Sequence, residues 1–218
     1  MFRFKQFAVR QDRCPMKVGT DGVLLGAWAE VRPGDRRMLD VGTGTGLIAL
    51  MLAQRSAARI TAVDVDAECA TQAAENFAAS PWADRLDAVA VAVQRYDPVE
   101  RFDLIVSNPP YYVDSLLSPD EGRNTAVVRL LAPGGRFALV LPPVEMQRFR
   151  SAALGRLYPV RWTEVYSTPR RGVRRILAEF CTTPVPPPEP SRLVIELGGS
   201  DSYTEDYRRL TGDFYLKF

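Results

Sequence analysis

Two short motifs contain the residue types that could do chemistry, Ser107-Asn-Pro-Pro-Tyr111 and Asp40-Val-Gly-Thr-Gly-Thr-Gly46. The 218-residue chain has no histidine, which excludes Ser-His-Asp and Cys-His nucleophiles and the His-x-x-Glu-His zinc helix. Any reaction must therefore use carboxylates, amides, tyrosines, backbone groups or a cofactor. In the first motif, the Asn108 amide oxygen and the Pro109 carbonyl are acceptors held in a stiff turn, and Tyr111 offers a ring on which a base can stack.

The glycines of the second motif indicate a turn that binds a cofactor. Gly42, Gly44 and Gly46 let the backbone turn tightly and let a ligand approach without meeting a Cβ. A dinucleotide fingerprint would require glycine where Leu47 stands, and a phosphate-binding P-loop would require a lysine. Asp64 ends the next predicted strand, eighteen residues after the loop, where a carboxylate can accept both hydroxyls of a ribose.

Both motifs resemble those of a known class of enzyme. Asp-x-Gly-x-Gly-x-Gly followed by the acidic residue resembles the loop of class I S-adenosylmethionine-dependent methyltransferases, which implies S-adenosylmethionine as the cofactor and no metal. Asn-Pro-Pro-Tyr resembles the motif of methyltransferases that modify a planar exocyclic or amide nitrogen. There, two acceptors face the two hydrogens of the amino group and favour a more tetrahedral nitrogen. The residues predicted to be catalytic are Asn108, Pro109, Pro110 and Tyr111.

Alternating strands and helices predict how the chain positions these motifs. Short apolar strands are expected at 37–41, 59–63, 86–93, 102–106 and 136–141, with helices at 20–28, 47–54 and 66–77. This alternation predicts βαβ units and a parallel sheet. Strands at 157–166 and 173–180 should then form a hairpin. The expected fold class is α/β, Rossmann-like, with a seven-stranded, mostly parallel sheet covered by helices on both faces.

The remaining segments are expected to be additions to one methyltransferase domain. Residues 1–30 would form a strand and a helix that cap the cofactor, and residues 36–181 the Rossmann-like core. Residues 183–218 would form a C-terminal extension. This extension follows a proline-rich linker at 182–190 and contains a strand candidate at 193–197 and a short helix from Ser202.

Three further stretches narrow the resemblance to one family. They are Gln11-Asp-Arg-Cys-Pro-Met-Lys-Val-Gly-Thr-Asp-Gly-Val-Leu-Leu-Gly-Ala-Trp28, Glu75-Asn-Phe-Ala-Ala-Ser-Pro-Trp-Ala-Asp-Arg85 and the segment from Tyr203 to Leu216. With the Asn-Pro-Pro-Tyr motif they make nearly the whole chain similar to the bacterial tRNA1(Val) adenine-37 N6-methyltransferases. The resemblance implies that Lys17 and Thr20 lie over the methionine end of the cofactor, and that Val93 and Gln94 contact its adenine. The full set of predicted cofactor contacts is Lys17, Thr20, Asp40, Gly42, Thr43, Gly44, Gly46, Asp64, Val65, Val93 and Gln94.

One segment departs from that family. Eighteen residues lie between Tyr112 and Leu131, where the family usually carries a longer basic loop and a full helix. Such a loop borders the catalytic motif and could gate the substrate. The sequence leaves open whether the short segment is a true deletion.

Arginine supplies 25 of the 28 basic residues, although the net charge is only +2. A GC-rich genome explains most of this bias, but Pro169-Arg-Arg-Gly-Val-Arg-Arg175 is a cluster at the tip of the predicted hairpin. A base beside the anticodon lies in a single-stranded loop, where it is easily splayed out towards a basic surface. The predicted RNA contacts are Arg13, Arg170, Arg171, Arg174 and Arg175, and the alternative is a charged turn that only aids solubility.

Three other functions fit part of the pattern. A methyltransferase that modifies a glutamine of a release factor also uses Asn-Pro-Pro-Tyr, but carries a helical N-terminal domain, and only about forty residues precede this glycine loop. A DNA adenine-N6 methyltransferase usually adds a larger target-recognition domain. An inactive module that only holds RNA would not need an intact Asn108-Pro-Pro-Tyr111.

The cysteine count and the distribution of apolar residues indicate the cellular compartment. Cys14, Cys69 and Cys181 are widely spaced, which suits a reducing compartment and shows no metal-site spacing. There is no apolar run of about 18 residues, and the N-terminal residues lack the apolar core of a signal peptide. We therefore expect a cytoplasmic protein without membrane contact. The family resemblance implies that it binds tRNA, and we expect it to be a monomer.

Overall fold

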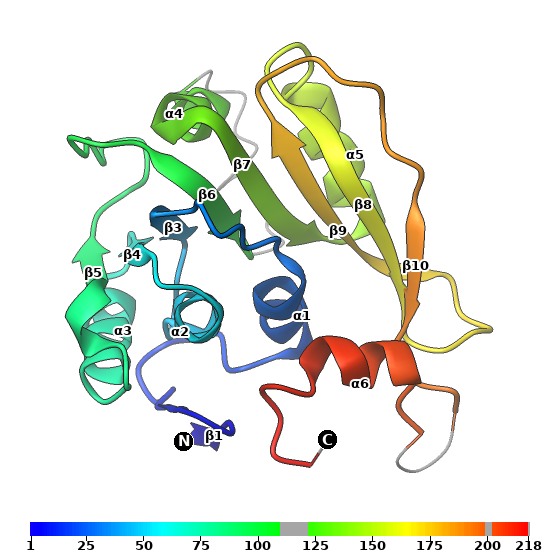
Figure 1. The fold of residues 1–218 in the computed structure, drawn as a ribbon, viewed down its shortest axis with the longest axis horizontal. Coiled ribbons are helices and arrows are strands. Elements are labelled where there is room, and N and C mark those ends of the chain that lie inside the picture. Colours follow the sequence, from blue (N-terminus) through cyan, green and yellow to red (C-terminus); the bar gives the residue numbers. More distant parts are fainter. Residues whose placement is uncertain (110–121, 199–201, 218) are drawn as a thin grey trace.

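The computed structural model describes residues 1–109, 122–198 and 202–217, and within these it contains an eight-stranded sheet (Figure 1). The strand order is β10-β8-β9-β7-β6-β3-β4-β5. Along the chain the strands are β3 (Arg37–Val41), β4 (Arg59–Asp64), β5 (Leu86–Ala90), β6 (Phe102–Ser107), β7 (Leu131–Leu141), β8 (Tyr158–Tyr166), β9 (Val173–Cys181) and β10 (Ser191–Val194). Strands β3 to β7 are mutually parallel, β9 runs antiparallel between β7 and β8, and β10 is parallel to β8.

Helices cover both faces of this sheet. The helices are α1 (Thr20–Trp28), α2 (Leu47–Arg55), α3 (Ala67–Ala78), α4 (Gly122–Leu130), α5 (Pro143–Ala152) and α6 (Glu205–Thr211), with a 3-10 turn at Ala83–Arg85. Side chains of α1, α2 and α3 share one apolar core with the N-terminal segment, whereas α4 and α5 pack in a second core on the opposite face. Helix α6 lies beside α1, below the sheet in Figure 1.

Most expected elements are confirmed, with boundaries shifted by a few residues. Asp66 caps α3 as predicted, because its carboxylate accepts a hydrogen bond of 2.9 Å from the Glu68 N–H. The expected strand at 86–93 ends at Ala90, and the N-terminal strand is a small antiparallel pair, β1 (Phe2–Arg3) with β2 (Ala8–Val9). Helices α4 and α5 were not expected, and α4 occupies the second half of the short segment before Leu131.

The number of strands predicted from the sequence was seven, and the structure corrects it to eight. The additional strand is β10, which brings the candidate at 193–197 into the main sheet beside β8. The preceding residues 182–190 have no helix or strand and are largely exposed, so they let the chain cross back to the edge. Leu193 is buried there and adds to the core shared with α1. Burial of this apolar side chain therefore favours sheet pairing over a separate extension.

Parallel strands place both motifs at one edge of the sheet. The glycine loop follows the carboxyl end of β3, Asp64 ends β4, and Asn108 follows β6. These three strands are neighbours, and the carboxyl ends of parallel strands meet along the same edge. No helix among the described residues is long and apolar enough to cross a membrane.

Candidate active site

The glycine loop is a left-handed turn between β3 and α2. Gly42, Gly44 and Gly46 have φ angles of +70°, +54° and +81°, a region that residues with a Cβ rarely adopt. The N–H groups of Gly42 and Thr43 donate to the Val63 carbonyl at 2.8 and 3.2 Å, which ties the loop to β4. A Cβ on Gly42 or Gly44 would meet no atom within 4 Å, so the loop presents bare backbone to open space.

The third glycine has a different role from the other two. A Cβ on Gly46 would lie 2.5 Å from Phe77 Cε1 of α3, so only glycine lets the loop and α3 pack this closely. Asn76, one residue earlier on α3, donates from Nδ2 to the Thr45 carbonyl at 2.8 Å. The loop is therefore held from behind by α3 while its other side stays open.

Asp40 organises the loop from inside the protein. Its fully buried carboxylate accepts the Thr43 hydroxyl at 2.7 Å and the Ala49 N–H at 3.2 Å through Oδ2. The second bond replaces a side-chain cap for α2, because Gly46 precedes that helix and has no side chain. Burial raises the pKa of Asp40 to about 7, although its two hydrogen bonds oppose that shift. Its Oδ1 has no hydrogen-bond partner among the described residues.

Asp64 joins the loop to the start of α3. Its Oδ2 accepts the Gly44 N–H at 2.9 Å, and its Oδ1 accepts the Asp66 N–H at 3.0 Å. Each carboxylate oxygen can accept a further hydrogen bond. Asp64 is half-buried and lines a cavity, so both oxygens remain within reach of a ligand.

The N-terminal segment is tied down over the loop by two buried amides of α3. Asn76 accepts the Arg10 N–H at 2.8 Å and donates to the Arg10 carbonyl at 2.9 Å, while Gln72 accepts the Arg13 N–H at 3.1 Å. Lys17 donates from Nζ to the carbonyls of Gln11 and Cys14 at 2.5 and 2.9 Å. These hydrogen bonds hold the N-terminal segment in a fixed position over the glycine loop.

One cavity of about 340 Å³ lies beside β4 and β6, and we call it the valine-lined cavity. Its walls include Val41, Val63, Val65, Val91 and Val93, with Asp64 and Gln94 as polar groups. Val65 is 79% exposed, so its side chain is accessible to a ring bound in this cavity. Cys14 and Cys69 complete the wall, and burial raises the pKa of both thiols, so they stay protonated at neutral pH.

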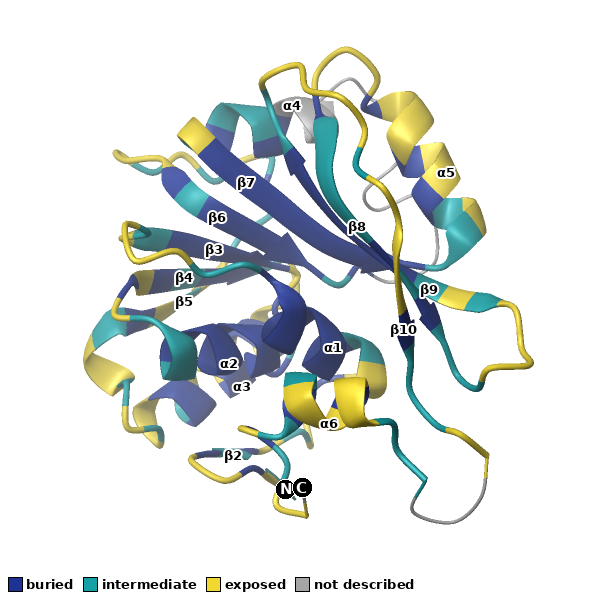
Figure 2. Ribbon diagram, turned by 45° about the vertical axis from the view of Figure 1, so that its right-hand side comes forward, coloured by how far each residue is buried: buried dark blue, intermediate teal, exposed yellow. Residues whose placement is uncertain are grey.

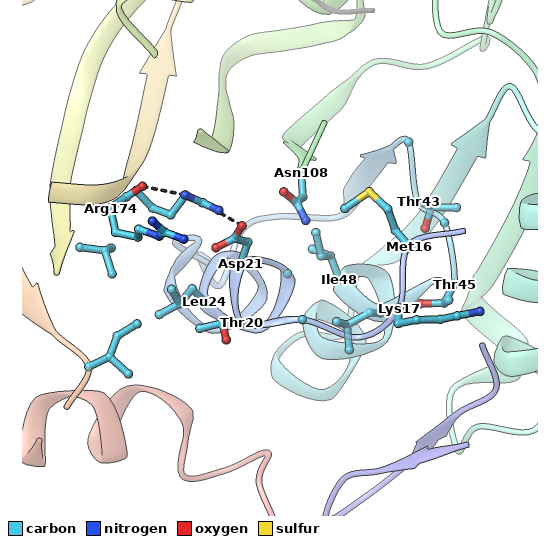
Figure 3. Close-up of a pocket in the computed structure, with 18 of the residues that line it drawn as sticks. Met16, Lys17, Thr20, Asp21, Leu24, Thr43, Thr45, Ile48, Asn108 and Arg174 are labelled. Atoms are coloured by element: carbon cyan, nitrogen blue, oxygen red, sulfur yellow. Dashed lines mark hydrogen bonds and ion pairs between the residues drawn. The ribbon is translucent and has the colours of Figure 1, made fainter. Parts of the chain in front are cut away.

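A second cavity of about 370 Å³ lies between α1 and β9, and we call it the arginine-lined cavity (Figure 3). Its polar wall contains Lys17, Thr20, Asp21, Thr43, Thr45, Ser167, Arg174 and Arg175. Thr20 begins α1, so the first turn of this helix borders the cavity. In Figure 3 the long side chain of Lys17 extends away from Asn108, in agreement with its hydrogen bonds to the N-terminal segment.

Asn108 stands where the two cavities meet. Both cavities are lined by Met16, Gly42, Gly44 and Asn108. Figure 3 shows the Asn108 amide pointing from the end of β6 into the space above α1. Its buried Oδ1 has no hydrogen-bond partner among the described residues, which leaves an acceptor available to a donor in the cavity.

Neighbouring residues fix this position. The Ser107 hydroxyl donates to the Val41 carbonyl at 2.8 Å and so ties the ends of β6 and β3 together. A Cβ on Gly22 of α1 would lie 3.0 Å from Leu47 and 3.9 Å from Asn108 Nδ2, so glycine lets α1 approach closely. Pro109 is buried and also lines the valine-lined cavity. Pro110 and Tyr111 lie outside the described residues.

The five arginines predicted to contact RNA lie in different surroundings. Arg170 and Arg171 are exposed in the turn between β8 and β9, the yellow loop at the right of Figure 2. Arg174 is exposed on β9 and lines the arginine-lined cavity. Arg175 Nε pairs with Asp21 Oδ2 of α1 at 2.8 Å, with both side chains largely buried. Arg13 is apart from them, paired with Glu75 of α3 at 3.1 Å.

Several residues of the site were missed in the sequence analysis. Asp21 was not among the predicted site residues, although the resemblance places it in the segment over the methionine end of the cofactor, and its pairing with Arg175 of β9 was not expected. Met16 borders both cavities, and Gln72 and Asn76 anchor the N-terminal segment. Asn76 could have been identified from the sequence, because asparagine in a helix interior is unfavourable unless its amide has specific partners.

The described residues can hold S-adenosylmethionine. Gly42 and Gly44 leave bare backbone at the junction of the cavities, where a Cβ would occupy the space. Asp64 offers acceptors for ribose hydroxyls beside an apolar wall for an adenine ring. No group of three potential metal ligands occurs within residues 1–109, 122–198 and 202–217.

The fold and the site define a methyltransferase. The family model of the methyltransferase small domain matches residues 21–156, which is more than half of the chain, so the chain belongs to that family. A protein of Parabacteroides distasonis named tRNA1(Val) (adenine(37)-N6)-methyltransferase is 46% identical over 99% of this chain and 98% of its own length. Proteins of the same name from Flavobacterium johnsoniae and Trichodesmium erythraeum are 43% and 41% identical, each over 100% of this chain and over 100% and 98% of their own lengths. The chain belongs to the tRNA1(Val) (adenine(37)-N6)-methyltransferase family.

Solved structures share the same fold at lower sequence identity. A predicted O-methyltransferase from Agrobacterium tumefaciens has a TM-score of 0.69 at 19% identity, over 89% of this chain and 96% of its own. The glycopeptide N-methyltransferase MtfA, solved with S-adenosylmethionine, has a TM-score of 0.58 at 15% identity, over 78% of this chain and all of its own. The Rossmann-like α/β fold class is thereby confirmed.

Proposed function

We propose that this protein transfers the methyl group of S-adenosylmethionine to the N6 amino group of an adenine in tRNA. The adenine we assign is position 37 of tRNA1(Val), next to the anticodon. The proposal is carried by one observation, the placement of Asn108 at the junction of the two cavities, with Pro109 next to it in the wall of the valine-lined cavity. Names of relatives that are 41–46% identical over 99–100% of the chain support the same substrate.

The valine-lined cavity takes the adenosine of the cofactor. Asp64 accepts the ribose hydroxyls, and Val65, Val93 and Gln94 surround the adenine ring. Gly42, Thr43 and Gly44, together with Thr20 and Lys17, would hold the methionine end of the cofactor. When bound, the cofactor supplies an activated sulfonium methyl group, so the protein's main task is to position the amino group in line with it.

Asn108 and Pro109 receive the target amino group. The lone pair of an adenine amino group is delocalised into the ring, which makes the nitrogen a poor nucleophile. The Asn108 amide oxygen and the Pro109 carbonyl accept hydrogen bonds from its two N–H groups and favour a tetrahedral nitrogen. On methyl transfer the sulfonium becomes a neutral thioether, and the nitrogen loses one of its two protons to water. Because the Asn108 Oδ1 is buried and lacks a partner among the described residues, it is preorganised for this bond. Pro110, which stiffens the turn, and Tyr111, on which the base would stack, stay predictions.

The arginines of the β8–β9 hairpin would bind the tRNA and bring the target adenine to Asn108. Arg174 is exposed and lines the arginine-lined cavity, and Arg170 and Arg171 are exposed in the turn that precedes β9. All three would contact phosphates of the anticodon loop. Arg175 pairs with Asp21 and so holds β9 against α1, which positions the hairpin that carries the other arginines. Arg13 is paired with Glu75, and a phosphate contact would require that exposed pair to open.

The remaining assignments concern the protein's setting. We infer a single methyltransferase domain, capped by residues 1–30 and extended by residues 183–218, that acts as a monomer in the cytoplasm without membrane contact. One chain supplies the walls of both cavities, which supports action as a monomer. All three cysteines are free thiols, which fits a reducing compartment.

Methyl transfer to total tRNA tests the proposal. The protein is incubated with labelled S-adenosylmethionine and tRNA from a strain that lacks this gene, and the tRNA is digested to nucleosides. We expect label in N6-methyladenosine, and no label when purified tRNA1(Val) carries guanosine in place of A37. Label in another nucleoside, or none in tRNA while the cofactor still binds, would contradict the proposal. A release factor would then be the next substrate to test, since a glutamine methyltransferase uses the same motif.

A further inference from the structure

A third cavity lies between the N-terminal strand and the C-terminal residues, and it borders the arginine-lined cavity. It has a volume of about 1000 Å³ and is bounded by β1, by the C-terminal residues 215–217 and by α6. It shares Gly19, Thr20, Ser167 and Ile195 with the arginine-lined cavity. We call it the terminal groove. Figures 1 and 2 both show the N- and C-terminal segments on the same, lower side of the molecule, and the ring centroids of Phe2 and Tyr215 are 6.4 Å apart.

The terminal groove has aromatic walls. Phe2, Tyr203 and Tyr215 line it, and each of these side chains is only half-buried. Tyr207 lies behind Tyr203 with ring centroids 5.3 Å apart and an interplanar angle of 27°. Tyr207 is 3% exposed, so it supports the Tyr203 ring from inside the protein. Half-buried rings with firm support are suitable surfaces for stacking of nucleobases.

Its charge is positive. Arg3, Arg208 and Lys217 line the terminal groove and are exposed, whereas Glu196 is the one carboxylate among its described lining residues. A basic groove interleaved with aromatic rings is typical of surfaces that bind single-stranded nucleic acid, because phosphates and bases are both recognised. A protein partner would instead bury an apolar centre with few charges.

The groove is formed before any ligand binds. The Lys5 N–H donates to the Phe214 carbonyl at 2.8 Å, and Lys5 Nζ donates to the Gly212 carbonyl at 2.5 Å. Gln54 of α2 donates to the Asp213 carbonyl at 2.9 Å. These bonds fix the C-terminal residues against the N-terminal strand and α2. Preorganisation of this kind lowers the entropic cost of binding.

We propose that the terminal groove binds the single-stranded nucleotides that flank the target adenine, with Tyr203 as a stacking surface and Arg3 and Lys217 as phosphate contacts. This inference rests on the proposed function, since the groove borders the cavity that would receive the adenine. Phosphates of the same RNA also meet Arg170 and Arg171, because the turn that carries them starts directly after Ser167 at the groove's edge. The RNA thus crosses the mouth of the arginine-lined cavity between two basic surfaces.

Charge reversal tests the phosphate contacts. The double variant Arg3→Glu/Lys217→Glu is compared with Arg148→Glu/Arg156→Glu, which makes the same charge change at exposed positions in and after α5, on the opposite face of the sheet. Affinity for an anticodon stem-loop RNA is measured by fluorescence anisotropy at several salt concentrations. We expect at least about tenfold weaker binding for the groove variant, and a salt slope smaller by about 1 to 2, because each lost phosphate contact removes about 0.7–0.9 from it. Cofactor affinity should stay unchanged.

A second pair of variants tests the stacking surface. Tyr203→Ala should weaken RNA binding by about five- to tenfold, whereas Tyr203→Phe, which keeps the ring, should bind as the wild type does. Equal RNA affinity and salt slope for the two charge-reversal variants, with normal methyl transfer to tRNA by the wild type, would overturn the groove assignment alone. Failure of the wild type to methylate tRNA at all would overturn the proposed function and this inference with it.

Discussion

The two cavities that meet at Asn108 are built in different ways. The valine-lined cavity consists mainly of residues at or just after the carboxyl ends of four neighbouring parallel strands, β3, β4, β5 and β6. The arginine-lined cavity combines the start of α1 with β9 and the segment after β10, which the Asp21–Arg175 pair brings together across 154 positions of sequence. The first cavity therefore follows from the sheet topology, and the second depends on long-range packing. We expect variants at the strand ends that form the valine-lined cavity to change cofactor binding, and variants of the arginines on the β8–β9 hairpin to change RNA binding.

The largest effect is expected at the glycine loop. Gly46→Ala would place a Cβ 2.5 Å from Phe77 in a backbone with φ of +81°, and we expect a loss of about 2–5 kcal/mol in unfolding free energy. Gly44→Ala meets no atom of the protein, so its stability loss should stay near 1–2 kcal/mol. Gly44 borders both cavities, however, so this variant should lose most of its cofactor affinity. Urea unfolding and calorimetric titration separate the two effects, and equal stability of the two variants would contradict the account.

The variant Asp64→Asn tests cofactor binding in the valine-lined cavity separately from RNA binding. The amide oxygen can still accept the Gly44 N–H, whereas the bond from the Asp66 N–H is lost, so the loop should fold with a small loss of stability. The charge that favours hydrogen bonds from ribose hydroxyls is also lost. Hydrogen bonds to charged groups contribute about 1.5–3 kcal/mol, so cofactor affinity should fall roughly 10- to 100-fold. RNA affinity should not change. Unaltered cofactor affinity would show that Asp64 serves only the loop.

The double variant Arg170→Glu/Arg171→Glu tests the contribution of the β8–β9 turn to tRNA binding. Both side chains are exposed at the turn of the β8–β9 hairpin, so the fold should tolerate the change. We expect tRNA affinity to fall about tenfold at physiological salt, because phosphate contacts are lost and repulsion is added, with the same cofactor affinity as the wild type. The control is again Arg148→Glu/Arg156→Glu. Equal tRNA affinity for both variants would mean that the hairpin arginines only keep the turn soluble.

The smallest effect concerns Asp40 and pH. Burial raises the pKa of Asp40 from 3.8 to about 7 in the folded protein, so the folded state binds a proton that the unfolded state has released. Stability from this group is complete below pH 3.8 and is lost as the pH rises through about 7. Relative to Asp40→Asn, which cannot titrate, the wild type should lose about 1 kcal/mol between pH 6 and pH 8. Parallel urea unfolding curves at both pH values check this, and the reverse sign would refute a raised pKa.

The difference between the cavities also explains what the sequence could predict. Asp40, the three glycines of the loop, Asp64 and Asn108 were identified because each lies at the end of a short apolar strand. The order of such strands in a parallel sheet places them together. The same local reasoning located the β8–β9 hairpin from two strand patterns that flank an arginine cluster.

Long-range contacts were not predictable in this way. The eighth strand depends on where the chain returns after the proline-rich linker, and nothing local to Leu193 specifies pairing with β8. Arg175 was predicted to contact RNA, but its pairing with Asp21 of α1 arises only from tertiary packing. Helix α5 begins with a proline, which favours a helix start, yet its apolar residues are too few to form a clear stripe.

The central claim is that Asn108 acts on the target amino group and not on cofactor or RNA binding. Single-turnover methyl transfer to tRNA1(Val), at saturating cofactor and enzyme, tests it with Asn108→Ala. We predict a rate lower by about 10²–10³-fold, with affinities for S-adenosylmethionine and tRNA within about threefold of the wild type. Asn108→Asp, which keeps an acceptor oxygen, should recover part of the rate. A normal rate for Asn108→Ala, or a loss fully explained by weaker cofactor binding, would contradict the account.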